Sequence, residues 1–268
     1  LCEHTWHSCA LSLLMDWYGS HDQPLLPTPD YGLLVFDQGW NTMTMLGGRI
    51  RPRTQASPGL LEVYLTWPWS VTGPHKAEHV MQHPEFCGML VSHALHAALL
   101  DWNKKQSPFW FFQLPSWQRD KPVDEIVFEA ANPPRADNHA LLASSAAAMN
   151  MLFPRATVHQ SVMRQAVMRH FGIPVGKGRK ASKEGSLHAV HSLIQQGRLE
   201  FIGESEPLAR QLLSWCDHVC DALLQMLYMW GHLVDQVVVH GPLSDAPYEP
   251  QALQSARFQG PPSWRPVQ

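Results

Sequence analysis

An apolar stretch that ends in a carboxylate is the feature of this sequence that most restricts its fold. Residues 32–36 read Gly-Leu-Leu-Val-Phe, as in a strand buried in the middle of a sheet, and Asp37 follows directly. Glu129 closes a second run of this kind, which begins at Glu125. Burying a lone carboxylate is costly unless it pairs or holds a cation. Both acids are therefore candidates for a charged functional site.

The order of predicted elements indicates a mixed α/β domain. Strands are expected over residues 32–37, 40–46, 61–67, 125–129 and 156–160. Gln38-Gly39 would turn the first strand into the second, and Gly47-Gly48 would close the second. Helices are expected over residues 89–100, 138–152 and 207–233. The first three strands would form a meander.

Proline-rich segments divide the chain into three parts. Residues 1–28 are expected to be an N-terminal extension, and residues 241–268 a Pro-rich tail. The domain between them covers residues 29–240. The first residue is Leu1 rather than Met, which suggests a trimmed precursor such as one with an organellar presequence.

The composition argues against several classes of protein. Charged residues make up 16% of the chain, below the typical ~25%, and the net charge is −3. No overall basic field therefore points to nucleic acid. No uncharged run reaches the ~18 apolar residues of a membrane span, so no membrane partner is expected. Five cysteines, an odd number in a long chain, favour a reducing compartment.

The last predicted helix adds a third set of polar groups. Asp217 and Asp221 are four residues apart and His218 and Asp221 three, so all can share one helix face. Taken singly, each acid also reads as an ordinary strand-end or helix-surface residue. Together with Asp37 and Glu129 they offer oxygen and imidazole ligands from three elements. Such a set suits two hard divalent cations.

A local basic segment lies between residues 155 and 183, which hold seven cations and no Asp or Glu: Arg155, Arg164, Arg169, Lys177, Arg179, Lys180 and Lys183. Neutralising several phosphates needs a patch of this kind. Gly176 and Gly178 would let the backbone approach a phosphate closely. The alternative interpretation is a solvated loop and helix face.

In this order the motifs resemble the RuvC-type Holliday-junction resolvases of the RNase H-like superfamily, including their mitochondrial and poxviral relatives. The matching pieces are Leu-Val-Phe-Asp37-Gln-Gly39, Ile-Val-Phe-Glu129, the basic segment and Asp217-His-Val-Cys-Asp221-Ala-Leu-Leu, and the similarity covers roughly residues 31–234. Two positions depart from the family pattern. Gln38 stands where members usually carry Pro, and His218 where many have Asp.

The resemblance implies an RNase H-like, RuvC-type fold, with a mixed five-stranded sheet flanked by helices. It implies Mg²⁺ or Mn²⁺ at a catalytic site, and the metal ligands would be Asp37, Glu129, His218 and Asp221. Asp217 is an alternative to His218, and Lys183 would lie near the scissile phosphate. The remaining cations would contact nucleic acid: Arg164, Arg169, Lys177, Arg179 and Lys180. The expected protein is a homodimer that cuts four-way DNA junctions, with a mitochondrial location.

A second class of function remains open. The chain would then be a catalytically retired RuvC-like subunit of a mitochondrial ribonucleoprotein, such as a ribosome or its assembly intermediate. It would contact structured RNA and the protein subunits of a large complex. Low charge, 11 Trp and the Pro-rich tail favour this interpretation. Retention of the acids favours a nuclease, although function need not follow fold.

Overall fold

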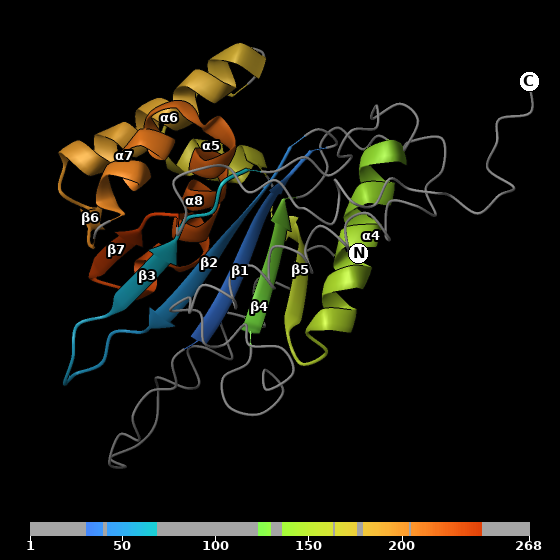
Figure 1. Cartoon of the computed structure of the whole chain (residues 1–268), viewed down its shortest axis with the longest axis horizontal. Coiled ribbons are helices and arrows are strands. Elements are labelled where there is room, and N and C mark those ends of the chain that lie inside the picture. The colour runs from blue at the N-terminus through green and yellow to red at the C-terminus, as the bar shows by residue number, and fades with distance from the viewer. Residues whose placement is uncertain are drawn as a thin grey trace, which may run out of the picture.

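The computed structural model describes residues 31–39, 42–68, 123–129, 136–162, 164–175, 179–203 and 205–242. These residues build one mixed sheet with helices packed around it (Figure 1). The sheet has seven strands, in the order β5-β4-β1-β2-β3-β7-β6. The expected helix over residues 89–100, and most of the two terminal segments, lie outside the described residues.

The centre of the sheet is the predicted meander. Strands β1 (Tyr31–Gln38), β2 (Met43–Arg51) and β3 (Leu60–Tyr64) pair antiparallel in sequence order. On the other side of β1, β4 (Val123–Glu129) pairs parallel with β1, and β5 (Thr157–Val162) pairs parallel with β4. An antiparallel meander extended by two parallel strands is the RNase H-like α/β arrangement. The predicted fold class is confirmed.

The sheet is larger than the five strands expected. Strand β7 (Gln236–His240) pairs parallel with β3, and the two-residue strand β6 (Glu200–Phe201) pairs parallel with β7. The sequence signal for β7 is short, because its apolar residues number only Val237 to Val239 and follow directly on a helix. The sequence does not show which edge of the sheet such a short apolar run would join.

The prediction that Gly47-Gly48 closes the second strand is wrong, because β2 continues to Arg51. A Cβ atom on Gly48 would stand 3.1 Å from the Met226 side chain and 3.2 Å from the Cβ atom of Leu33. The glycine is therefore a packing position within the strand, where a helix lies close to the sheet. The turn between β1 and β2 begins at Gly39, as predicted, and the Gly39 N–H donates to the Thr42 carbonyl at 2.8 Å.

The predicted final helix is two helices. Helix α7 (Glu206–Trp215) ends at Cys216, whose backbone is extended (φ −93°, ψ 98°), and α8 (Asp217–Trp230) begins at the next residue. A short 3₁₀ turn, η3 (Gly231–Leu233), follows α8. The apolar periodicity continues across Cys216, so it does not reveal the break. The break makes Asp217 and His218 the first residues of a new helix.

Helix α8 carries the main core. Its buried side chains, among them Val219, Leu223 and Met226, pack on Leu33 and Leu46 of the sheet. Helices α5 (Arg164–His170) and α6 (Arg179–Gln195) lie near α7 and α8, whereas α4 (Ala136–Leu152) lies beside β5 (Figure 1). Within the described part of the chain, no helix is long and apolar enough to cross a membrane.

Candidate functional site

The two strand-end acids lie side by side. Because β1 and β4 are parallel and Phe36 pairs with Phe128, the next residues, Asp37 and Glu129, lie at the same end of the two strands. The two Phe rings stack with centroids 4.8 Å apart beneath them. Asp37 is only 5% exposed. The apolar strands thus hold the carboxylate of Asp37 in a buried position and that of Glu129 in a half-buried one.

The first turn of α8 brings the next groups to this edge. Nδ1 of His218 donates to Oδ2 of Asp37 at 2.5 Å. This hydrogen bond is the main reason why the pKa of His218 is raised above its ordinary value. Asp221, one turn further along α8, has a side chain that is 11% exposed. Asp37, Glu129, His218 and Asp221 therefore come together from β1, β4 and α8, three elements that are distant in the sequence.

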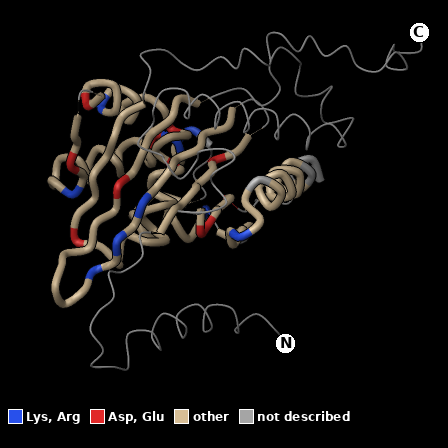
Figure 2. Tube along the Cα trace, turned by 60° about the horizontal axis from the view of Figure 1, so that its bottom comes forward, with Lys and Arg blue, Asp and Glu red and all other residues tan. Residues whose placement is uncertain are grey.

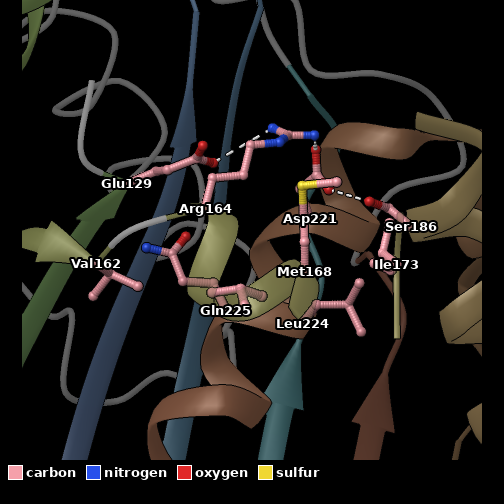
Figure 3. A pocket seen from close by; sticks show the side chains of 10 residues that line it. Glu129, Val162, Arg164, Met168, Ile173, Ser186, Asp221, Leu224 and Gln225 are labelled. Carbon is pink, nitrogen blue, oxygen red and sulfur yellow. Dashed lines mark hydrogen bonds and ion pairs between the residues drawn. The ribbon is translucent and has the colours of Figure 1, made fainter. Parts of the chain in front are cut away.

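Arg164, the first residue of α5, lies between two of the acids (Figure 3). Its Nη1 atom is 3.6 Å from Oε2 of Glu129, and its Nη2 atom donates to Oδ2 of Asp221 at 2.7 Å. The same Nη2 atom donates to Ser182 of α6 at 3.1 Å. The sequence predicted Arg164 as a nucleic-acid contact, and the structure places it inside the acidic centre.

Two further polar residues of the site were not predicted. The Ser186 hydroxyl of α6 donates to Oδ1 of Asp221 at 2.5 Å. Gln225, four residues after Asp221 on α8, is 3% exposed and its amide nitrogen has no hydrogen-bond partner among the described residues. A glutamine within the most apolar part of a helix, on the face of His218 and Asp221, is the signal that could have revealed it.

A small cavity adjoins the centre (Figure 3). Its empty volume is about 280 Å³ including its open mouth. Apolar side chains such as Met168 and Leu224 form part of its wall, and the polar groups on the wall are Glu129, Arg164, Ser186, Asp221 and Gln225. The acids therefore border solvent on one side and the hydrophobic core on the other.

Burial, reinforced by repulsion between the carboxylates, raises the pKa values of two acids of the centre. Burial, followed by the negative charges of Asp37 and Asp221, raises the pKa of Glu129 to about 8, although Arg164 opposes the shift. Burial and the charge of Asp37 raise the pKa of Asp221 to about 6, against hydrogen bonds from Ser186 and Arg164. The chain thus gathers more negative charge here than its own cations fully compensate.

This donor set suits a divalent cation in kind but is not arranged around one. Carboxylate oxygens are the ligands that Mg²⁺ and Mn²⁺ prefer, and an excess of buried carboxylate charge favours a cation. Among the described residues, however, no group of three or more His, Cys, Asp or Glu side chains is positioned to hold a metal ion. The guanidinium group of Arg164 lies between Glu129 and Asp221 instead.

Asp217 and Lys183 form a separate ion pair beside the centre. Nζ of Lys183, on α6, contacts Oδ2 of Asp217 at the start of α8. Of the two alternatives that the sequence left open, His218 is the residue that contacts Asp37, and Asp217 contacts Lys183. Lys183 lies close enough to lower the pKa of His218 by its charge, so it borders the same centre.

The other predicted nucleic-acid contacts are partly described. Arg169 on α5 is exposed, and Lys180 on α6 is exposed and 3.8 Å from Glu184. Lys177 lies outside the described residues, and Arg179 begins α6. Lys and Arg positions are interspersed with Asp and Glu along the described trace (Figure 2).

Comparison with known proteins gives structural neighbours only. No protein-family model matches the sequence, and no curated protein matches it. The chain is similar to the crystal structure of the yeast mitochondrial Holliday junction resolvase Ydc2, with 14% sequence identity and a TM-score of 0.46, over 79% of this chain and 82% of that one. It is also similar to Thermus thermophilus RuvC, with 8% identity and a TM-score of 0.35, over 75% and 94% of the two chains.

Proposed function

We propose that the chain is a metal-dependent, structure-specific endonuclease that cuts four-way (Holliday) DNA junctions. The observation that carries the proposal is the convergence of three carboxylates from β1, β4 and α8: the buried Asp37, hydrogen-bonded to His218, and the half-buried Glu129 and Asp221. Keeping such charges together costs stability, and the raised pKa values of Glu129 and Asp221 express that cost. A chemical function explains why a chain would retain them.

The residues of the centre have distinct roles in this proposal. Asp37, Glu129, Asp221 and His218 would hold Mg²⁺ or Mn²⁺, which supplies an activated water and stabilises the leaving oxygen when bound. Ser186 fixes Asp221 through its 2.5 Å hydrogen bond. Lys183, tied to Asp217 at the border of the centre, offers an ammonium group to the reacting phosphate.

The nucleic-acid surface would extend from this centre over α5 and α6. Arg169 and Lys180 are exposed there, and we assign Lys177 and Arg179 to the same surface. These groups would contact phosphates irrespective of sequence. Two copies of the chain would present two centres to one junction and cut it symmetrically. We place this activity in mitochondria, following the family branch that the motifs resemble.

Cleavage of a synthetic four-way junction by the purified chain in Mg²⁺ tests the proposal. We expect paired nicks near the branch point, little cleavage of linear duplexes with the same arms, and none in EDTA. Asp37→Asn should lose activity by at least about 100-fold, since it removes one charged ligand. Glu206→Gln, which neutralises an acid on α7 whose side chain is 40% exposed, should cut normally. Equal cleavage by wild type and Asp37→Asn, or none by either, would contradict the proposal.

A second candidate function is a structural subunit of a mitochondrial ribonucleoprotein. The observation that favours it is the pairing of each acid with a cation of the chain itself: Asp37 with His218, Glu129 and Asp221 with Arg164, and Asp217 with Lys183. Such a centre is held together without a metal. In that case the purified chain would bind structured RNA and leave junction DNA uncut in Mg²⁺.

A further inference from the structure

The position of Arg164 between Glu129 and Asp221 has a consequence for metal binding. Its guanidinium group contacts the outermost residue of β4, the second turn of α8 and Ser182 of α6. Guanidinium is a planar donor group whose positive charge persists at any pH of interest. One side chain therefore contacts carboxylate oxygens that a divalent cation would use as ligands.

The charge balance makes this contact strong in the free protein. His218 already engages Asp37, so Arg164 is the cation that separates the two remaining carboxylates. Without it, the carboxyl groups of Glu129 and Asp221 would repel each other whenever both are ionised. Arg164 thus stabilises the free protein where a bound metal would otherwise do so.

Arg164 nevertheless has a route out of the centre. Its side chain is 31% exposed, compared with 19% for Glu129 and 11% for Asp221. Because it begins α5, its long side chain can rotate outward without disturbing the rest of that helix. Ser186 would keep Asp221 in place after such a rotation (Figure 3). Once outside, the guanidinium group would meet the nucleic acid, where phosphate is an equivalent partner.

We propose that Arg164 is an internal counter-ion that competes with the divalent metal for Glu129 and Asp221. This inference rests on the proposed function, and by it Arg164 would regulate metal binding at the nuclease centre. In the free protein Arg164 keeps metal affinity low. Metal binding displaces Arg164 outward, where a DNA phosphate can receive it, so that DNA and metal favour each other's binding. The centre would then bind the metal chiefly when DNA is also bound.

Direct measurement of Mn²⁺ affinity tests the competition without relying on cleavage. The full chain, free of nucleic acid, is titrated with Mn²⁺, and free Mn²⁺ is followed by electron paramagnetic resonance. Arg164→Gln should bind Mn²⁺ about tenfold more tightly than wild type, within the usual range of coupling between two sites. Arg198→Gln, which removes an exposed arginine elsewhere, should bind as wild type does.

A second variant guards against loss of folding in the first. Arg164→Lys keeps the charge but loses the planar fork, so its Mn²⁺ affinity should lie between those of wild type and Arg164→Gln. Equal or weaker Mn²⁺ binding in a folded Arg164→Gln or Arg164→Lys, with wild type still binding, would overturn the inference and leave the proposed nuclease standing. Absence of Mn²⁺ binding in every variant would overturn both.

Discussion

Glu129 is the residue at which the acidic centre most clearly lowers the stability of the fold. Its ordinary pKa of 4.5 is raised to about 8, first by burial and then by Asp37. In the unfolded chain the carboxyl group is ionised above about pH 4.5, whereas the folded protein holds its proton up to about pH 8. The unfolded state therefore gains from ionisation across this window, and the stability of the folded protein falls as pH rises through it.

Glu129→Gln should consequently stabilise the metal-free protein. The substitution keeps the shape of the side chain and removes an unfavourable buried charge. We expect a gain of about 1 kcal/mol or more in the free energy of unfolding at pH 8 and little change near pH 4.5. Urea unfolding at both pH values checks this. A variant less stable than wild type at pH 8 would show that the pairing of Glu129 with Arg164 outweighs the repulsion.

The sequence predicts the ligand-type residues of the site but not their contacts. Asp37 and Glu129 could be found because each follows an apolar strand, and Asp221 because it shares a helix face with His218. The contacts of Asp221 with Arg164 and Ser186 join residues 57 and 35 positions apart. These contacts depend on how α5 and α6 pack on α8, which the sequence does not show. For this reason the sequence predicted Arg164 as a surface residue that contacts nucleic acid.

At the scale of elements, the distance between α8 and the sheet depends on a glycine of β2. Met226 of α8 lies against Gly48, and Leu33 of β1 lies beside both. A side chain at position 48 would crowd Met226 of α8 and Leu33 of β1. Because α8 carries His218 and Asp221, its distance from the sheet also determines where these two side chains lie relative to Asp37.

Gly48→Ala should therefore destabilise the fold. The added methyl group would stand 3.1 Å from Sδ and Cε of Met226 and 3.2 Å from Cβ of Leu33, so these neighbours have to give way by a few tenths of an ångström. We expect a loss of about 1–3 kcal/mol, typical of an overpacked core, seen as a lower urea midpoint. Gly231→Ala is the matched control, since its added atom would be 3.8 Å from the nearest neighbour. Equal effects of the two substitutions would show that this close approach is unimportant.

The elements themselves were predictable to different degrees. Strand β1 and helix α4 have strong local signals and lie within one or two residues of the predicted ranges. The division between α7 and α8 was missed because Cys216 is apolar and continues the helical pattern. Strand β7 was missed because pairing with β3, across most of the domain, is what makes it a strand.

At the scale of the whole molecule, the fold concentrates charge at one edge of an apolar sheet. The carboxyl ends of β1 and β4, the start of α8 and the first turns of α6 meet there. Helix N-termini carry partial positive charge, so α6 and α8 favour anions at this edge, whether carboxylates or phosphates. The remainder of the described sheet and helices serves to hold these ends together.

The central claim, that this edge is a divalent-metal centre, is tested most directly by anomalous diffraction. Crystals of the protein bound to a four-way junction would be grown with Mn²⁺. We predict an anomalous peak about 2.0–2.6 Å from carboxylate oxygens of Asp37, Glu129 and Asp221, with Arg164 turned outward. A junction complex in which Arg164 still bridges Glu129 and Asp221, and no peak lies at these acids, would contradict the account.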